Sequence, residues 1–417
     1  MTTYHGKLAK KAWMVAPETV QVMEALAATG IEPRFVGGCV RNALVNRDVL
    51  DIDIATPLRP NEVIEHLTTA KIKSVPTGLS HGTVTAVVDG KTFEITTLRI
   101  DVNPLGRHAE VEFTDDWKKD AARRDFTINA MSANIHGDVF DPFGGIEDLR
   151  IGRVVFVGDP DQRIEEDVLR ILRYFRFYAH FGQGLPDGPA LRACARAASR
   201  LPRLSAERIR QETFKILESD RCAVVWHIML RAGVVTHFLP EATNVRALER
   251  LLAEEQDHHA HAFVLRRLAA VLEVMLTGID PLVSGLKLSN EQADQLLTML
   301  EPPLEVRTDM PEKYVRRMVY ALGNDMARTL LLLRTAKTGE KKNLDALYNV
   351  ATAFRAPRFP LIGDDLRKLG WGQGPEIGRI LSELEEWWIE QDFAPGRTAA
   401  LEKLASEYAP PSSSNAP

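Results

Sequence analysis

The stretch VLDIDIAT, residues 49–56, places Asp51 and Asp53 two positions apart in a run of apolar and β-branched residues. On a strand, residues two apart point to the same face, so the carboxylates share one face while Ile52 and Ile54 share the other. Two ionised carboxylates side by side repel each other unless a cation lies between them or water covers that face. The pair therefore indicates either a solvated acidic edge strand or a divalent metal site.

Length and composition bound the class of protein. A chain of 417 residues with 45% hydrophobic and 26% charged residues suggests roughly two to four globular domains. No apolar run approaches the roughly 20 residues that span a bilayer, and the N-terminus does not resemble a secretory signal. The three cysteines fit neither a disulfide framework nor a zinc pattern. These features predict a cytoplasmic protein with no membrane contact, and they imply no protein partner.

The pattern of apolar residues changes once, near residue 150. Before it, short strand-like runs alternate with helical segments, including a predicted helix over residues 17–29 that ends at Gly30. From about residue 160 onward, apolar residues recur every three or four positions and strand-like runs almost vanish. The fold class predicted is α+β, with a small N-terminal sheet domain and an all-helical remainder. The Pro- and Ser-rich end, residues 409–417, is expected to be disordered.

A glycine turn precedes the acidic pair. In FVGGCVRNAL, residues 35–44, a strand runs into Gly37 and Gly38 and then into a helix that carries Arg41. Glycines let the backbone approach a ligand, and amides at the start of a helix attract anions. Two glycines after a strand are weak evidence alone, since tight turns use glycine for steric reasons. With the carboxylate pair a dozen residues later, they indicate metal-bridged phosphoryl chemistry.

Two further segments offer polar side chains to the same cleft. Glu94 lies in the strand-like TFEITTLR and is either a third carboxylate beside the pair or an ordinary polar strand residue. The segment RRDFTINAM, residues 123–131, gathers Arg124, Asp125 and Asn129 in a short amphipathic stretch.

A third segment, EEDVLRILRYFRF at residues 165–177, carries four polar residues spaced three apart. On a continuous helix they would form a slowly drifting ridge opposite a buried apolar side. The ridge is either a solvated ladder of ion pairs or an arginine-rich face that suits phosphates and bases. Its members are Asp167, Arg170, Arg173 and Arg176.

Together with PTGLSHGTVTAVV and DPFGGIEDL, these motifs resemble, in order and spacing, those of class II tRNA nucleotidyltransferases over residues 30–180. These are the bacterial and eukaryotic CCA-adding enzymes, which are related to bacterial poly(A) polymerases. A weaker likeness to the helical tail of the CCA-adding branch extends over residues 362–390. Two positions depart from the family pattern: Asn42 replaces the usual Asp, and Val168 replaces a common Pro.

The resemblance implies a polymerase-β-like nucleotidyltransferase head that uses two Mg²⁺ ions, CTP and ATP to extend tRNA. Asp51 and Asp53 would hold the metals and Glu94 would support them as a third catalytic carboxylate. Asp167 and Arg170 would read the incoming base in place of a nucleic-acid template. The residues implied to bind the nucleotide are Gly37, Gly38, Arg41, Arg124, Asp125, Asn129, Asp167, Arg170, Arg173 and Arg176.

The chemistry of that protein template follows from hydrogen-bond polarity. Cytosine and adenine each present an exocyclic amino donor beside a ring-nitrogen acceptor, so one carboxylate and one guanidinium suit either base. Uracil and guanine reverse this polarity, at a cost on the order of 1 to 3 kcal/mol per mismatched contact. One fixed pair can therefore select C and A.

The resemblance also implies how the chain is divided. The expected parts are a catalytic head at 1–150, a helical neck at 151–215, a helical body at 216–305 and a tRNA-binding tail at 306–408. A basic stretch after the nucleotide-reading segment is either a solvated face or a contact surface for the acceptor stem of tRNA. Its foremost members are Arg192, Arg196 and Arg200.

Three functions remain open on the sequence alone. They are CCA addition to tRNA, poly(A) addition to RNA ends, and RNA binding by a copy of the fold that has lost catalysis. All the expected metal and nucleotide side chains are present, which argues against lost catalysis. The segment PTGLSHGTVTAVV has the form seen in CCA-adding enzymes and favours the first function, with addition of only CC or only A left open.

Overall fold

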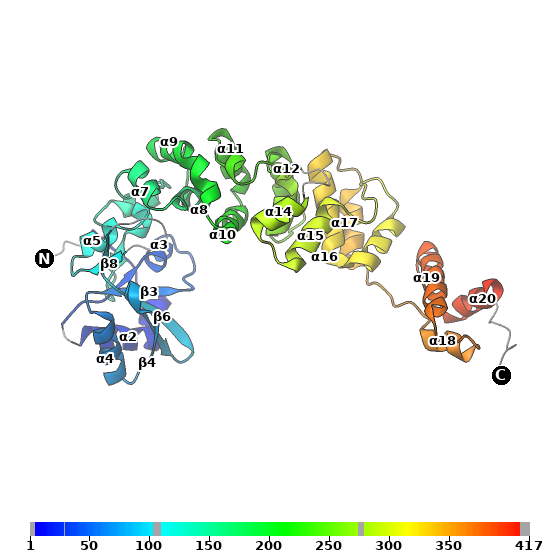
Figure 1. Cartoon of the computed structure of the whole chain (residues 1–417), viewed down its shortest axis with the longest axis horizontal. Helices are drawn as coiled ribbons and strands as arrows, with labels where there is room; N and C mark the ends of the chain where they lie inside the picture. Colours follow the sequence, from blue (N-terminus) through cyan, green and yellow to red (C-terminus); the bar gives the residue numbers. More distant parts are fainter. Residues whose placement is uncertain (1–4, 29, 103–109, 274–278, 409–417) are drawn as a thin grey trace. The chain divides into compact units, whose positions relative to one another are not determined.

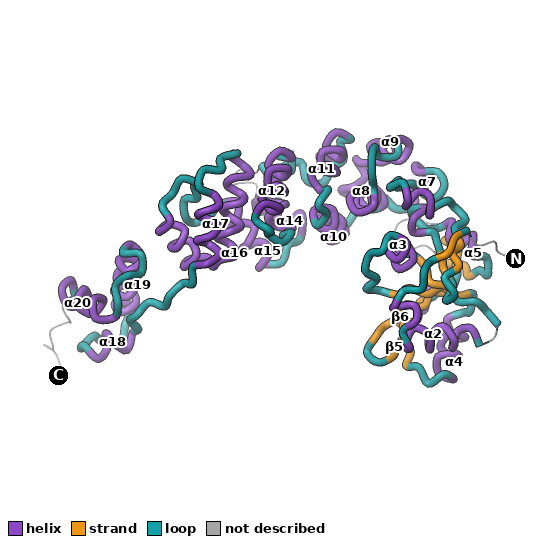
Figure 2. The backbone as a smooth tube through the Cα atoms, turned by 180° about the vertical axis from the view of Figure 1, so that it is seen from behind, coloured by secondary structure: helices purple, strands orange, loops and turns teal. Residues whose placement is uncertain are grey.

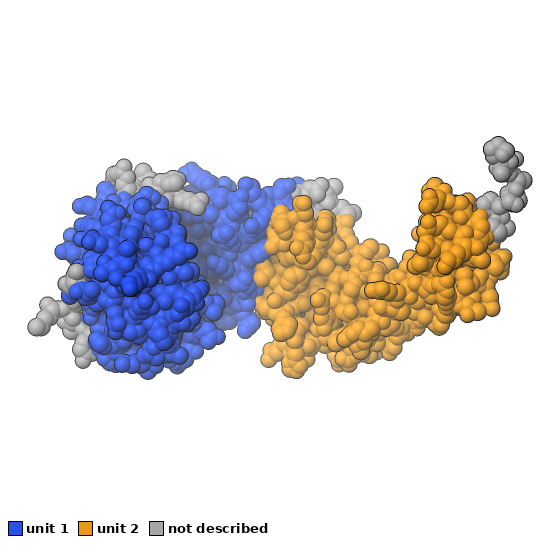
Figure 3. Space-filling view, turned by 90° about the horizontal axis from the view of Figure 1, so that it is seen from below, with its two compact units in different colours: residues 1–243, 280–287 blue, residues 244–279, 288–417 orange. Residues whose placement is uncertain are grey.

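The computed structural model describes residues 5–28, 30–102, 110–273 and 279–408. It divides into two compact units, coloured separately in Figure 3: residues 1–243 with 280–287, and residues 244–279 with 288–417. The segment 409–417, expected to be disordered, lies outside the described residues.

The first unit is built on an eight-stranded sheet with the order β1-β10-β9-β2-β3-β6-β5-β4. A two-stranded ribbon, β7 with β8, lies outside it. The strands, drawn in orange in Figure 2, are β1 Gly6–Lys7, β2 Arg34–Val36, β3 Ile52–Thr56, β4 Lys73–Gly78, β5 Thr83–Val88, β6 Lys91–Thr97, β7 Arg99–Val102, β8 Glu110–Phe113, β9 Ser132–Ala133 and β10 Asp138–Phe140.

Side-chain alternation explains these strands. In β5, Val84, Ala86 and Val88 are buried, while Thr83, Thr85 and Val87 are partly exposed. This is the period of two expected of a strand with one covered face. The helix α2, Pro17–Ala27, begins with Pro at its first position and buries its apolar stripe. It confirms the predicted helix there, and the end predicted at residue 29 lies outside the described residues.

Short helices complete the sheet domain, and longer ones follow it (Figure 1). A cluster of aromatic rings from Phe126, Phe156, Tyr174 and Phe177 packs the end of the sheet domain against α8. The remaining helices of this unit are α1 Ala12–Val15, α3 Gly38–Leu44, α4 Pro60–Thr69, α5 Trp117–Ala122, α6 Gly145–Arg150, α7 Pro160–Glu166, α8 Arg170–Phe181, α9 Gly188–Ala197, α10 Ala206–Leu217, α11 Cys222–Arg231 and most of α14 Ile279–Leu286.

The second unit is helical throughout its described residues. Its helices are α12 Val245–Asp257, α13 Val264–Val271, α15 Asn290–Leu300, α16 Glu312–Thr338, α17 Leu344–Ala353, α18 Gly363–Lys368, α19 Pro375–Glu390 and α20 Arg397–Glu407. Helix α16 is interrupted at Gly323, whose φ of +81° is incompatible with a helix. In the core, buried Glu255 accepts hydrogen bonds from buried Arg266 and Arg267, so these charges are paired.

The predicted α+β class, with a sheet domain followed by helices, is therefore confirmed. No helix among the described residues is long and apolar enough to cross a membrane.

Candidate active site

The carboxylates of the opening motif lie at the centre of the sheet. Strand β3 pairs in parallel with β6, and Asp53 is the direct neighbour of Glu94 in that register. Asp51 immediately precedes β3 and is exposed. Burial, followed by the charge of Glu94, raises the pKa of Asp53 to about 6, although Arg124 acts in the opposite direction. The strands thus hold two repelling carboxylates side by side.

Gly37 allows the backbone to pass close to these groups. Its φ of +69° favours glycine, and a Cβ there would lie 3.3 Å from Arg124 Nη1 and 3.9 Å from Asp53 Oδ2. The turn therefore places backbone, a guanidinium and a carboxylate at one point. Gly38 starts α3, and Arg41 follows one turn later.

Arginines dominate the cavity beside this turn. The cavity has a volume of about 540 Å³ and is lined by seven arginines and three aspartates, besides Gly37, Gly38, Asn129, Leu169 and Phe177. Such an excess of guanidinium groups suits a polyanion. The charged lining residues are Arg41, Arg99, Arg123, Arg124, Arg170, Arg173, Arg208, Asp53, Asp125 and Asp167.

A chain of hydrogen bonds fixes one wall of the cavity. Asp125 accepts from Arg173 Nε at 2.7 Å and from Asn129 Nδ2 at 3.0 Å, and Asn129 accepts from Arg41 Nη1 at 2.5 Å. Burial opposes the ionisation of Asp125, but the charge of Arg173 and these hydrogen bonds keep its pKa below the ordinary value. Burial and the charge of Arg176 lower the pKa of Arg41 to about 10. The wall therefore presents the guanidinium of Arg41, which is hydrogen-bonded to an amide and not to a carboxylate.

Residues 165–177, considered above as a helix that would carry a ridge of polar side chains, form parts of two helices instead of one. Helix α7 ends at Glu166, and α8 begins at Arg170. Asp167 between them is extended, with φ of −149°, and its Oδ1 accepts from the amide of Leu169 at 3.1 Å. Val168 stands where the family pattern has a Pro that would mark the start of the next helix. The carboxylate stabilises the turn that precedes α8 instead of continuing the ridge.

Asp167 and Arg170 both face the cavity, but each has a different partner. Asp167 Oδ2 accepts from Arg208 Nη2 at 2.8 Å, and Arg170 Nη1 donates to Glu166 Oε2 at 2.5 Å. Each of the two side chains is thus positioned by a neighbouring residue, and they do not bind each other.

The chain matches two protein-family models and is similar to several known proteins. Residues 33–155 match the family described as "Poly A polymerase head domain", and residues 189–245 match "Probable RNA and SrmB- binding site of polymerase A". The mitochondrial CCA tRNA nucleotidyltransferase 1 of Danio rerio is 35% identical over 397 residues, which cover 93% of this chain and 90% of that protein. The human protein of that name is 36% identical over 87% of this chain and 84% of its own.

The chain belongs to the CCA tRNA nucleotidyltransferase family. The CCA-adding enzyme of Streptococcus gordonii is also 32% identical over 88% of this chain and 92% of its own length. In fold, the chain resembles the Bacillus stearothermophilus CCA-adding enzyme solved with CTP, with a TM-score of 0.70 over 93% of this chain and 97% of that one, at 24% identity.

Asn42, which replaces the usual Asp of the family, contacts Arg41. Asn42 Oδ1 accepts from Arg41 Nη2 at 2.9 Å, and its Nδ2 donates to the carbonyl of Asp48 at 3.1 Å. An amide therefore orients Arg41 without neutralising it.

Other expected residues lie outside the cavity. Arg176 donates to Glu212 at 2.5 Å and lies over the ring of Phe177. Arg196 is exposed and pairs with Asp161 at 2.5 Å, while Arg200 lies 3.8 Å from Glu165. Arg192 lies against the start of its own helix, near Gly188.

Two carboxylates that position arginines of the cavity were not identified from the sequence. Buried Asp120 accepts hydrogen bonds from Arg123 at 2.8 Å and from Arg124 at 3.2 Å, and Glu166 holds Arg170. The spacing of Asp120 three and four residues before the arginines on a helix was the available signal.

Proposed function

We propose that this CCA tRNA nucleotidyltransferase adds C, C and A to the 3′ end of tRNA from CTP and ATP, with release of pyrophosphate, in the arginine-lined cavity beside Asp53. The observation that carries the proposal is the coincidence of that cavity with paired strand carboxylates, in a chain that aligns with CCA-adding relatives over about nine-tenths of its length. CCA addition is the activity of the family to which the chain belongs.

The ligands of solved relatives support the substrates. CCA-adding enzymes of the same fold have been solved with CTP, with ATP and, for the Thermotoga maritima protein, with tRNA. We infer that CTP, ATP and tRNA are the ligands of this chain as well.

The metal site is proposed at Asp51 and Asp53, with Glu94 beside them, as a site for two Mg²⁺ ions. Two observations fit this assignment: oxygen ligands suit Mg²⁺, and Asp53 lies against Glu94 with a raised pKa, as expected of carboxylates that await a cation. Among the described residues, no three His, Cys, Asp or Glu side chains are placed to hold a metal ion by themselves, so oxygens of the substrates would have to complete this site. Bound Mg²⁺ would activate the 3′-hydroxyl and neutralise charge on the triphosphate.

The phosphates are assigned to the glycine turn and its arginines. The backbone at Gly37 and Gly38 can approach an anion closely, and Arg41 and Arg124 flank the turn. Asn129 and Asp120 orient these two guanidiniums, so the charges are in place before the nucleotide arrives.

The base is assigned to Asp167 and Arg170. A carboxylate oxygen has two lone pairs, so Asp167 can keep its bond to Arg208 and still accept from the amino group of cytosine or adenine. Arg170 donates to the ring nitrogen beside that amino group, while Glu166 holds its position. Arg173 belongs to this wall through Asp125.

We divide the chain into four parts, and its cysteines bear on the cell compartment. We assign residues 1–150 to a catalytic head, 151–215 to a neck, 216–305 to a body and 306–408 to a tRNA-binding tail. The three cysteines are buried and widely spaced, which does not suit a disulfide framework and supports a reducing compartment, for which we propose the cytoplasm. The similar vertebrate proteins are named mitochondrial, and the similar bacterial ones carry no such designation.

The experiment that tests this function compares RNA acceptors. Labelled CTP should enter tRNA that lacks its terminal CCA and should not enter an unstructured RNA oligonucleotide of equal length. Poly(A) polymerase activity would instead give long A tails on both acceptors with ATP alone.

A further inference from the structure

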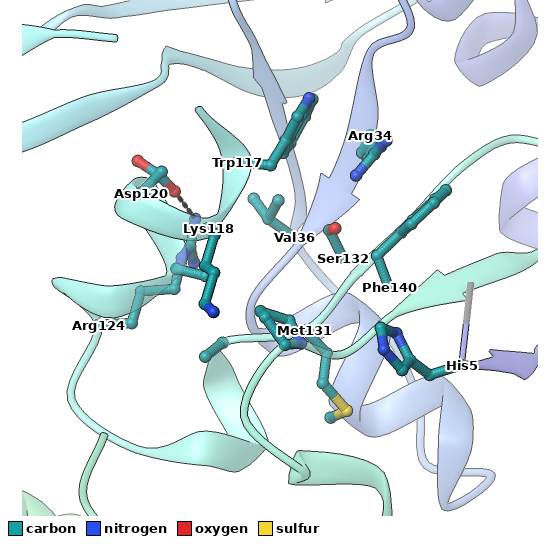
Figure 4. Close-up of a pocket in the computed structure, with 13 residues that line it drawn as sticks. His5, Arg34, Val36, Trp117, Lys118, Asp120, Arg124, Met131, Ser132 and Phe140 are labelled. Carbon is teal, nitrogen blue, oxygen red and sulfur yellow. Dashed lines mark hydrogen bonds and ion pairs between the residues drawn. The ribbon is translucent and has the colours of Figure 1, made fainter. Parts of the chain in front are cut away.

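A second cavity, of about 360 Å³, lies between α5 and the strands β2, β9 and β10 (Figure 4). Its walls combine the rings of Trp117 and Phe140 with Met131 and several polar side chains. The polar lining residues are His5, Arg34, Lys118, Asp120, Arg124 and Ser132.

Arg34 is the unusual group in this lining. The residue is only 3% exposed, and its guanidinium carbon lies 4.3 Å from the ring centre of Trp117 and 3.5 Å from that of Phe140. Figure 4 shows it between the two rings, with one end of the guanidinium directed toward Ser132. Aromatic faces attract the cation but supply no hydrogen-bond acceptor in its plane.

The hydrogen bonds of Arg34 are incomplete. Glu32 accepts from Nε at 3.0 Å and approaches Nη2 at 2.9 Å, whereas Nη1 is buried and has no partner in the described part of the chain. Glu32 is itself half-exposed and also accepts from Asn134. A buried donor of a charged group that has no acceptor lowers the stability of the folded protein. An acceptor supplied by a ligand would therefore stabilise Nη1 of Arg34.

The charges of the other lining residues point to an anion. Lys118 is exposed at the mouth, while His5 and Arg124 add further nitrogen groups. The carboxylate there, Asp120, is already bound to Arg123 and Arg124 and to the amide of Arg99. A ligand in this cavity therefore meets the exposed ammonium of Lys118 and a guanidinium, Arg34, which is paired with Glu32 on one side and has an unused donor on the other.

We propose that this cavity binds a small organic anion, a phosphate monoester or a carboxylate with a flat apolar body. The anionic group contacts Arg34 and Lys118, and the flat body lies along Trp117, Phe140 and Met131. The site is distinct from the catalytic cavity but shares Arg124 with it. Nothing in the proposed catalytic reaction uses Arg34, Trp117 or Phe140.

The test uses the full chain labelled with 5-fluorotryptophan, in which six tryptophans give fluorine signals. The Trp117 signal is assigned from the variant Trp117→Phe. Phenyl phosphate and benzoate are titrated separately, with benzyl alcohol as the uncharged control, in the presence of saturating CTP to occupy the catalytic cavity. We expect a saturable shift of the Trp117 signal with at least one anion and no shift with benzyl alcohol, and the two Kd values identify the preferred anionic group.

Matched variants locate the anion. Lys118→Met should weaken binding about threefold, as expected for loss of one exposed charge, whereas Lys119→Met, an exposed lysine on the same helix that does not line the cavity, should leave Kd unchanged. Arg34→Lys keeps the charge but loses the planar donors and should weaken binding about tenfold. The proposal is overturned if the Trp117 signal does not move with either anion. Equal effects of the two lysine variants, or complete displacement of the probe by CTP, would overturn it as well.

Discussion

Asp167 is bound by Arg208 from α10, and not by Arg170, although Arg170 lies only three residues further along the chain. The Asp167 Oδ2 to Arg208 Nη2 distance is 2.8 Å, and Arg170 instead binds Glu166. Two residues assigned to base recognition are therefore positioned by separate neighbours. This arrangement orients a carboxylate and a guanidinium toward one cavity without letting them neutralise each other.

Removal of Arg208 tests its role in positioning Asp167. Arg208→Met should raise KM for CTP and ATP several-fold and lower the kcat/KM ratio of CTP over UTP, because the carboxylate loses its fixed orientation. The matched control is Arg203→Met, an exposed arginine just before α10. In the double variant with Asp167→Ala, the ratio should equal that of Asp167→Ala alone. Additive losses of the ratio would show that Arg208 acts independently of Asp167.

The assigned reading pair is tested by base discrimination. Asp167→Ala should relax selection against UTP and GTP more than it slows transfer, because the acceptor that rejects their carbonyl oxygens is lost while the phosphate contacts remain. Arg170→Ala should weaken CTP and ATP and spare UTP relatively. The measurement is the ratio of kcat/KM for CTP over UTP in each variant. If both variants keep the wild-type ratio, even at reduced rates, base choice is made elsewhere.

The sequence indicates which residues are candidates for this site, but not how they are arranged in space. The carboxylates and glycines lie in short segments whose local pattern specifies a strand or a turn. The position of Asp53 beside Glu94 depends on the pairing of β3 with β6, which joins residues about 40 apart and leaves no local signal. The side chain of Asp167 is held by Arg208, 41 residues away, and the sequence around Asp167 continues the helical period. The pocket around Arg34 likewise assembles from distant segments.

Substitution of Asp53 should separate activity from stability. Asp53→Asn removes a charge proposed to bind metal, and transfer should fall on the order of 1,000-fold or more. The same change relieves repulsion with Glu94, so the free energy of unfolding should stay equal or rise by about 0.5 to 1 kcal/mol. Turnover and denaturant unfolding are measured on the same preparation, with Asp48→Asn as an exposed control. Near-normal turnover of Asp53→Asn would contradict the metal assignment.

The basic stretch is tested through the salt dependence of tRNA binding. Arg196→Ala with Arg200→Ala should raise KM for tRNA and leave KM for CTP unchanged, and should reduce the slope of log K against log salt by about 1.5 to 2 if each contacts one phosphate. Both arginines pair with acids on α7, so tRNA must displace Asp161 and Glu165 from them. The control is Arg150→Ala, an exposed arginine that also pairs with an acid. An unchanged slope would identify a solvated face of ion pairs.

We expect one cavity to add C, C and A in order without a nucleic-acid template. The most direct measurement is sequencing of the 3′ ends of tRNA that lacks CCA after incubation with CTP alone, ATP alone and both nucleotides. We expect two added C residues with CTP alone, no addition with ATP alone, and a terminal CCA with both. Long A tails with ATP alone, products that stop at CC when both nucleotides are present, or incorporation of UTP at the rate of CTP would contradict it.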